Sequence, residues 1–184
     1  EKREEVTTEG GLALTEPDQM ESTGEALAQL VSSGIRTSLF IDPDEASIHA
    51  AADIGADAVE LHTGEYANAT VGTRAREITR LSRASTLASK LGLSVHAGHG
   101  LTYENVQPIV SIPEIEELNI GHSIVARSVF TGLERAVEDM ARIIRQARLK
   151  AGSTGVRPLL GSLSPPSCFG GRFRVSRSSM CGRT

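Results

Sequence analysis

Four short apolar segments recur along the chain, each bounded by glycine, proline or polar residues. Their lengths and their content of Val, Ile, Leu and Ala are typical of buried β-strands. The segments predicted as strands are residues 37–41, 58–62, 94–98 and 115–120. Between them the apolar residues return at helical spacing, so the chain is predicted to alternate strands with helices.

Helices are predicted before, between and after these strands. Their apolar faces consist of Leu27, Leu30 and Val31 in 22–33, of Ile78, Leu81, Leu87 and Leu91 in 71–91, and of Leu133, Val137, Met140 and Ile144 in the last helix. A shorter helix, 103–112, is interrupted by Pro108. The helix after the first strand is predicted to begin with Asp42 as N-cap and Pro43 at its first position, and to stop at Gly55.

Regular alternation of strands and helices predicts a parallel sheet, either open and doubly wound or closed into an eight-stranded barrel. Polar residues recur where each strand ends, and in a barrel all these ends meet at one mouth. In an open sheet, ligand-binding residues gather at a single switch point instead. The polar strand ends are Asp42, His62-Thr63-Gly64, His99-Gly100 and Gly121-His122. This distribution favours a (β/α)8 TIM barrel.

Four strands cannot close an eight-stranded barrel. The predicted fold is therefore an incomplete α/β barrel over residues 1–152, the C-terminal half or slightly more, with the other strands expected ahead of Glu1. The chain opens on Glu1 rather than Met, which fits either a processed chain or a fragment. The missing strands are expected to leave two sheet edges and apolar faces uncovered.

Composition narrows the class of protein. The chain has 184 residues, 39% hydrophobic but only 3% aromatic, so one domain with a core of Ala, Leu, Ile and Val is expected. The net charge of −4 gives no reason to expect a nucleic-acid partner. No segment approaches the roughly 18 apolar residues of a membrane span, and no signal peptide opens the chain. A cytoplasmic protein is predicted.

Residues 153–184 differ in composition from the rest of the chain. They hold five arginines, no acidic residue and both cysteines, and they show neither a helical nor a strand period. A disordered tail is predicted, without a disulfide between Cys168 and Cys181, because disulfides are rare in the cytoplasm. The alternative is a basic RNA-binding tail, which so few bases and only two Phe disfavour.

The segment SVHAGHGLTYENV, 94–106, carries the clearest candidate chemistry. Gly98 and Gly100 allow a sharp turn and a close approach of the backbone to a ligand. His99 between them is predicted to reach the barrel mouth, where an imidazole exchanges protons near neutral pH. The alternative is a structural histidine bonded to a neighbouring carbonyl. His96, earlier on the strand, is interpreted as structural.

Two further segments are candidates for phosphate binding. Gly121-His122 ends one strand and opens a helix, whose unpaired N–H groups favour an anion, although a structural helix cap explains the same residues. The loops after the last two strands of a barrel commonly hold phosphate. In EVTTEGG, 5–11, Thr7 and Thr8 could bind a hydroxyl or phosphate group, or could form turns.

Glu60 and His62 are two residues apart on a predicted strand and so share one face. A carboxylate beside an imidazole there either tunes a pKa or forms an internal salt bridge. A metal site is not predicted, because the histidines lie on separate strands without close ligand spacing.

Five segments together resemble one enzyme family. They are EKREEVTTEGG, SLFIDPD, ELHTGEYA, AGHGLTYENV and IPEIEELNIGHSIVARSVFTGL. The chain is similar over residues 1–152, in consistent order, to pyridoxine 5′-phosphate synthase of vitamin B6 biosynthesis. The resemblance implies a (β/α)8 barrel assembled as a homo-octamer. It also implies a transferase that condenses 1-deoxy-D-xylulose 5-phosphate with 3-amino-2-oxopropyl phosphate. The implied products are pyridoxine 5′-phosphate, phosphate and water, and no metal or organic cofactor is implied.

The same resemblance implies roles for individual residues. His99 matches the family's proton donor. Gly100, Gly121 and His122 match positions that hold the aminooxopropyl phosphate, and Thr7 matches a contact to the deoxyxylulose phosphate. It assigns no role to Glu60 or His62.

The chain also departs from the family pattern. The Asn-x-Asp-His, His-Leu-Arg and Leu-Glu-Met segments of the family's first three strands, with two proton acceptors and most phosphate-binding arginines, do not occur. The tail has no family counterpart. A truncated, inactive fragment of the synthase is therefore expected. The alternatives are a non-catalytic phosphate-binding partial barrel and an interaction module whose basic tail binds a partner.

Overall fold

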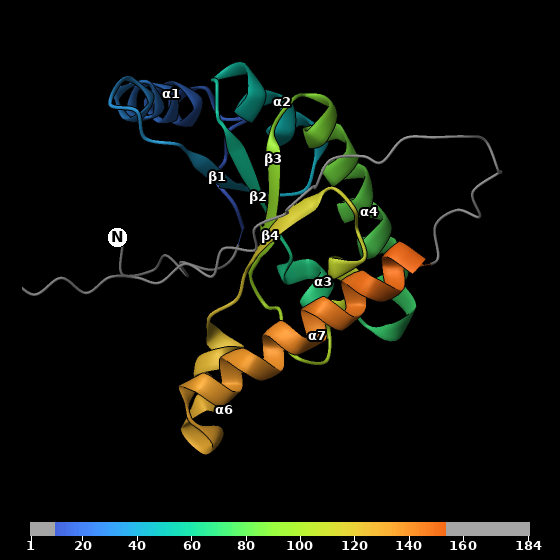
Figure 1. Cartoon of the computed structure of the whole chain (residues 1–184). Helices are drawn as coiled ribbons and strands as arrows, with labels where there is room; N and C mark the ends of the chain where they lie inside the picture. The colour runs from blue at the N-terminus through green and yellow to red at the C-terminus, as the bar shows by residue number, and fades with distance from the viewer. Residues whose placement is uncertain (1–9, 154–184) are drawn as a thin grey trace, which may run out of the picture.

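A four-stranded parallel sheet forms the centre of the protein (Figure 1). The computed structural model describes residues 10–153. The strands are β1 (Ser38–Ile41), β2 (Ala58–His62), β3 (Ser94–Gly98) and β4 (Ile115–Asn119). They lie side by side in chain order, β1-β2-β3-β4. β2 and β3 have the predicted bounds, β1 begins one residue later than predicted, and β4 ends one residue earlier.

Helices precede, connect and follow the strands. They are α1 (Pro17–Ser32), α2 (Glu45–Asp53), α3 (Gly64–Asn68), α4 (Val71–Lys90), α5 (Val106–Val110), α6 (His122–Thr131) and α7 (Leu133–Ser153). The sequence did not predict α3, which has five residues, or the break at Gly132, where a φ of 81° separates α6 from α7. α1 and α2 lie at one end of the molecule, and α6 and α7 at the other (Figure 1).

The start of α2 corrects one prediction. Asp44, not Asp42, is the N-cap, and its carboxylate accepts hydrogen bonds from Ser47 N at 2.9 Å and Ser47 Oγ at 2.7 Å. The helix consequently begins at Glu45, after Pro43 rather than with it. Aspartate is a common N-cap residue at either position. Only Asp44, however, lies three residues before Ser47, whose backbone N–H donates the capping hydrogen bond. Asp42 is thereby left for another contact.

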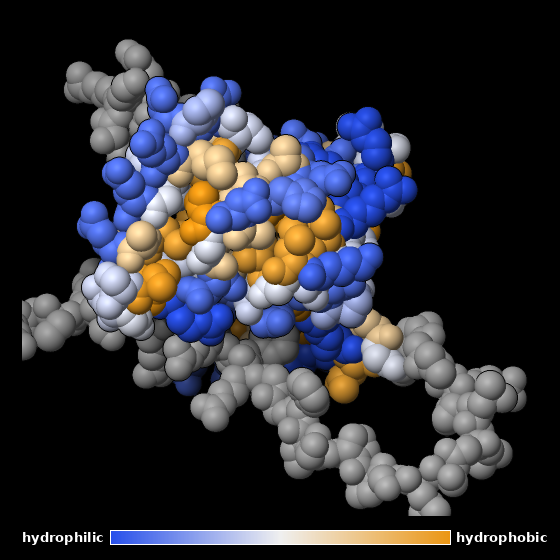
Figure 2. Space-filling view, turned by 90° about the horizontal axis from the view of Figure 1, so that it is seen from above, coloured by the Kyte–Doolittle hydropathy of each residue, from blue (hydrophilic) through white to orange (hydrophobic). Residues whose placement is uncertain are grey.

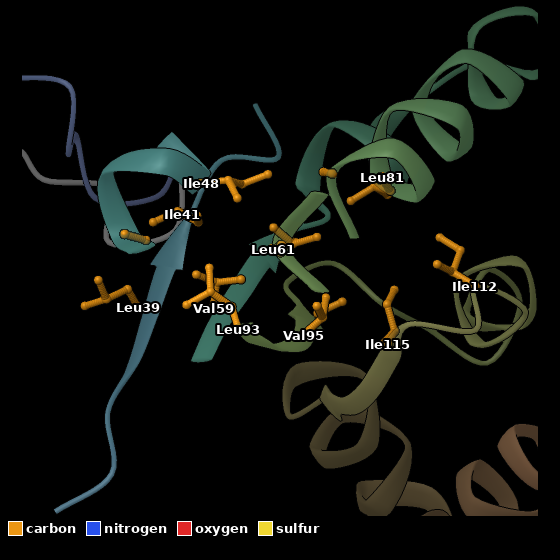
Figure 3. Packing of buried hydrophobic residues seen from close by; sticks show 14 of the residues in the cluster. Leu39, Ile41, Ile48, Val59, Leu61, Leu81, Leu93, Val95, Ile112 and Ile115 are labelled. Carbon is orange, nitrogen blue, oxygen red and sulfur yellow. The ribbon is translucent and has the colours of Figure 1, made fainter. Parts of the chain in front are cut away.

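One face of the sheet is buried under helices. Leu39, Val59 and Val95 lie on neighbouring strands and form the centre of an aliphatic core (Figure 3). Ile48 of α2 and Leu81 of α4 pack against them. Buried branched side chains that alternate with polar ones along each strand explain why β2 and β3 were predictable.

The opposite face of the sheet is polar. The register aligns Phe40, Glu60, His96 and Glu117 across the four strands. His96 Nδ1 lies 3.4 Å from Ser38 Oγ. Two cavities, of about 500 and about 510 Å³, are lined by residues of this face. This face therefore carries carboxylates and an imidazole, whereas the expectation that missing strands leave sheet edges and apolar faces uncovered stays a prediction.

The strand order supports the barrel interpretation over the open doubly wound sheet. In a doubly wound sheet the order reverses at a switch point, whereas here each strand pairs with the next along the chain. α2 contacts β1, and α4 contacts β2 and β3. This is an α/β fold consistent with a partial TIM barrel.

Large apolar side chains also lie on the surface. Viewed from the side of α1 and α2, hydrophobic residues occupy the middle of the face, crossed and surrounded by hydrophilic ones (Figure 2). At the other end, α6 has no buried residue and exposes Val125, Val129 and Phe130. Clustered exposed apolar residues are typical of surfaces that contact other polypeptides.

Among residues 10–153, no helix is both long and apolar enough to cross a membrane. The predicted disordered tail from residue 154 onward and the candidate Thr7 lie outside the described residues, and the division at residue 152 stays a prediction.

Candidate functional site

The carboxyl ends of the strands surround a cavity of about 500 Å³. His99, Gly100, Gly121 and His122, predicted separately from the sequence, all line it. The other lining residues are Phe40, Glu60, Leu101, Thr102, Asn119, Ile120 and Ser123. The structure therefore brings together every candidate binding or catalytic residue of the described segment.

The turn after β3 explains the two glycines of the AGHG segment. His99 has a φ of 79° and Gly100 a φ of 73°, so two successive residues adopt the left-handed conformation. A methyl group at Gly98 would lie 3.0 Å from Asn119 O, and one at Gly100 would lie 2.6 Å from Ala67 Cβ. Glycine is thus needed on both sides of His99 for close packing. His99 itself adopts a conformation that costs a non-glycine residue roughly 1–2 kcal/mol.

Thr63 connects the end of β2 to this turn. It is fully buried, and its N–H donates to Gly98 O at 2.8 Å. Its hydroxyl lies 2.7 Å from Gly98 O and 2.5 Å from His99 O. Thr63 is among the polar residues at the strand ends, but the sequence pattern predicts no role for it. A buried threonine directly after a strand was the only available signal.

His62 packs beneath His99. The two ring centroids are 4.9 Å apart, and Phe40 meets the His62 ring edge-on at 5.2 Å. Nδ1 of His62 lies 3.2 Å from Asp42 Oδ1. Its Nε2 is buried and has no hydrogen-bond partner among the described residues. Asp42 thus orients the imidazole that forms the floor under His99.

The predicted pairing of Glu60 with His62 is replaced by two separate contacts. Glu60 Oε2 accepts a hydrogen bond from Asn119 Nδ2 at 2.6 Å, whereas the carboxylate partner of His62 is Asp42. Burial raises the pKa of Glu60, and the nearby Glu117 carboxylate raises it further. The Asn119 hydrogen bond and the His62 imidazole oppose this rise in pKa.

Burial lowers the pKa of His99 from its ordinary value, and the neighbouring His62 lowers it further. A cationic imidazole loses solvation when buried and is repelled by a second positive charge. Both effects favour the neutral form of the His99 imidazole. A neutral imidazole can accept a proton and then return it.

The start of α6 forms the other side of the cavity. Gly121 is the N-cap residue and offers no side chain to the first N–H groups of the helix. Gly121 O accepts from Val125 N at 2.9 Å, and Ser123 Oγ donates to Leu101 O at 2.8 Å, which anchors the helix start to the loop after β3. His122 is exposed beside these free N–H groups. The arrangement suits an anion.

The loop after Gly100 is held by its own hydrogen bonds. Asn105 Nδ2 donates to Gly100 O at 3.0 Å, and Asn105 Oδ1 accepts from Thr102 N at 2.7 Å. Tyr66 of α3 donates its hydroxyl to Asn105 O at 2.5 Å. Residues from β2, α3 and the loop therefore fix the wall that carries His99.

Thr7 lies outside the described residues, and the first described residue, Gly10, lies near the carboxyl end of β1. Leu12 N donates to Phe40 O at 2.7 Å, and a methyl group at Gly10 would lie 3.9 Å from Asp42 Oδ2. The chain thus runs from the carboxyl end of β1 back along that strand. Within residues 10–153, no three His, Cys, Asp or Glu side chains are grouped to hold a metal ion.

Residues 1–146 match the model of a protein family described as Pyridoxal phosphate biosynthesis protein PdxJ. The chain is 54% identical over 148 residues to the pyridoxine 5′-phosphate synthase of Magnetococcus marinus and 51% identical over 148 residues to that of Sulfurihydrogenibium sp.. Each match covers 80% of this chain and 60% of the relative. The chain therefore spans about 60% of the length of these curated relatives.

The fold is also similar to a chain in the crystal structure of the Amycolatopsis orientalis BexX/CysO complex. The TM-score is 0.51 at 17% identity, and the match covers 77% of this chain and 55% of that chain. At this identity the similarity concerns the fold alone.

Proposed function

The chain belongs to the pyridoxal phosphate biosynthesis protein PdxJ family, and we propose that it forms the phosphate-binding and proton-transferring part of a pyridoxine 5′-phosphate synthase. The proposed reaction condenses 1-deoxy-D-xylulose 5-phosphate with 3-amino-2-oxopropyl phosphate in vitamin B6 biosynthesis. The observation that supports it is one cavity lined both by the His99 imidazole and by the uncapped start of α6. The first moves protons and the second binds phosphate.

Phosphate binding is assigned to Gly100, Gly121 and His122. The first N–H groups of α6 have no side-chain cap, so a phosphate oxygen satisfies them and interacts favourably with the helix dipole. The His122 imidazole can donate a further hydrogen bond to the charged phosphate beside them. This geometry suits the phosphate of 3-amino-2-oxopropyl phosphate.

Proton transfer is assigned to His99. Ring closure releases water, and a hydroxyl leaves from carbon only when it gains a proton. An imidazolium held at the cavity wall can supply this proton. Burial and His62 lower the pKa of His99, and a phosphate dianion bound nearby raises it, because an opposite charge favours the cation. Substrate binding thus prepares the proton donor.

The remaining features concern the whole protein. We propose a complete (β/α)8 barrel, a homo-octameric assembly, a cytoplasmic location and no metal or organic cofactor, as the family resemblance implies. The consecutive parallel strands and the curated relatives' greater length support the complete barrel. Thr7 is proposed to contact 1-deoxy-D-xylulose 5-phosphate, since Gly10 lies at the mouth of the site. The competing proposal is a non-catalytic phosphate-binding barrel.

A fusion enzyme tests the proposed activity. The part of the Magnetococcus marinus synthase that the match leaves out is joined ahead of Glu1, and formation of pyridoxine 5′-phosphate is followed by its fluorescence. We expect turnover by the fusion and none by the 184-residue chain, because four strands do not close a barrel. A fusion that binds inorganic phosphate but forms no product would favour the non-catalytic alternative.

His122→Asn should raise the KM of the fusion enzyme for 3-amino-2-oxopropyl phosphate about 10-fold or more, with a smaller change in kcat. A charged hydrogen bond to phosphate contributes about 1.5–3 kcal/mol, and it is present in both the ground state and the transition state. Steady-state kinetics measure both constants. His49→Asn, an exposed histidine on α2 outside the cavity, is the control and should change neither. A His122 variant that loses only kcat would contradict the phosphate-binding role.

A further inference from the structure

Thr63 makes a pair of hydrogen bonds that a simple link between two strands does not need. Its backbone N–H already continues the pairing of β2 with β3 by donating to Gly98 O. The hydroxyl adds a second donor, within reach of Gly98 O and of His99 O. Two successive carbonyl oxygens approach one hydroxyl only because the chain reverses at His99.

The carbonyl of His99 depends on this hydroxyl more than the carbonyl of Gly98 does. Gly98 O keeps the Thr63 N–H as a donor when the hydroxyl is removed. Within residues 10–153, the hydroxyl is the single hydrogen-bond donor to His99 O. Removal of the hydroxyl therefore affects mainly His99, the residue in the left-handed conformation.

The conformation of His99 also decides where its ring lies. At a φ of 79° the imidazole lines the cavity and packs against His62, which Asp42 holds in place. A β-region conformation at His99 would continue β3 and turn the side chain out of this contact. A left-handed histidine is strained, so a specific contact is needed to maintain it.

We propose that Thr63 is a positioning residue whose hydroxyl, by binding the His99 carbonyl, holds His99 in the left-handed conformation that directs its imidazole into the cavity. The contribution to catalysis rests on the proposed role of His99. The conformational claim does not, and it can be tested on the 184-residue chain itself.

The conformational test compares Thr63→Val, which loses the hydroxyl but keeps the volume, with Thr63→Ser, which keeps the hydroxyl. Thr79→Val is the matched control, since the Thr79 hydroxyl bonds only within α4. NMR measures the intraresidue amide–Hα NOE of His99, which is strong at positive φ, and the imidazole pKa by ¹⁵N shifts.

We expect Thr63→Val to lose the strong NOE and to shift the His99 pKa back towards its ordinary value. Thr63→Ser and Thr79→Val should change neither. An unchanged His99 in Thr63→Val, or equal changes in the Val and Ser variants, would overturn the proposal.

The stability of the variants gives a second criterion. Thr63→Val should lower the folding equilibrium constant about 10-fold, the usual effect of a lost buried hydrogen bond, and Thr63→Ser should lower it less. Should Thr63→Val not fold, Thr63→Ala, which also lacks the hydroxyl, takes its place. The strong His99 NOE must then be lost in Thr63→Ala and persist in Thr63→Ser.

In the fusion enzyme, Thr63→Val should reduce kcat about 10-fold, with KM within about threefold of the unsubstituted fusion. Thr63→Ser, which keeps the hydroxyl, should have a kcat close to that of the unsubstituted fusion. If His99→Asn left kcat intact, the proposed function would fail while the NMR result on Thr63 still stood. If His99→Asn abolished turnover but Thr63→Val did not affect kcat, the positioning role would fail and the proposed function would remain.

Discussion

His99→Asn should lower the kcat of the fusion enzyme by about 10²-fold or more, with KM little affected. Asparagine keeps the approximate size of the side chain and a hydrogen-bonding group but removes the titrating nitrogen. A positioned acid or base typically contributes about 10²–10⁴-fold to the rate, and this contribution appears in kcat because the proton moves in the transition state. Steady-state kinetics with both substrates at saturation measure the effect.

His96→Asn is the matched control for this result. His96 lies on β3, which ends one residue before His99, and it lines a different cavity from His99. We expect its kcat and KM to stay within about threefold of the unsubstituted fusion. Near-normal kcat in His99→Asn together with loss of turnover in His122→Asn would show that the two roles are reversed.

The pH dependence of kcat gives a second criterion for the same substitution. A proton donor is active in its charged form, so kcat should fall as the pH rises through the pKa of His99 in the substrate complex. Burial and His62 lower the pKa of His99, and bound phosphate would oppose this shift. His99→Asn should lack this limb of the profile, which a merely structural histidine would not produce.

The sheet was predictable from sequence because its physical requirements act on every residue of each strand. Leu61 and Val95 alternate with polar neighbours, and this period identifies β2 and β3 without reference to the rest of the chain. The convergence of His99 with His122 was predictable for the same reason, since parallel strands deliver their carboxyl ends to one edge.

Contacts that depend on the exact path of a loop could not be predicted in this way. Asp42 and Asp44 are both suitable caps by residue type, and only the distance to Ser47 N decides between them. Asp42 is therefore free to orient His62, a pairing that joins the ends of two different strands. Thr63 was overlooked because its partners are backbone carbonyls, which leave no pattern in the sequence.

The polar face of the sheet was not evident from the predicted strands alone. Glu60, His96 and Glu117 lie in one row across the strands. Carboxylates and an imidazole are costly to bury without partners, so these residues cannot form a dry core. The raised pKa of Glu60 is a consequence of placing a carboxylate there.

Gly100→Ala should lower the free energy of unfolding by about 2–5 kcal/mol. The left-handed φ of 73° contributes roughly 1–2 kcal/mol once a Cβ is present, and the contact of that Cβ with Ala67, at 2.6 Å, adds about 1–3 kcal/mol of overpacking. Denaturant unfolding measures the change. The His99 turn should be displaced at the same time, because α3 carries Ala67 and leaves no room for the methyl group.

Gly34→Ala separates the two causes, since Gly34 has the same φ of 73° but no atom within 4 Å of an added methyl group. It should therefore lose only the roughly 1–2 kcal/mol of conformational strain. Ala67→Gly should recover the remaining loss in the Gly100→Ala background, as a coupling of about 1–3 kcal/mol in the double-mutant cycle. Equal losses in Gly100→Ala and Gly34→Ala, with no coupling to Ala67, would mean that backbone strain alone requires glycine at the cavity wall.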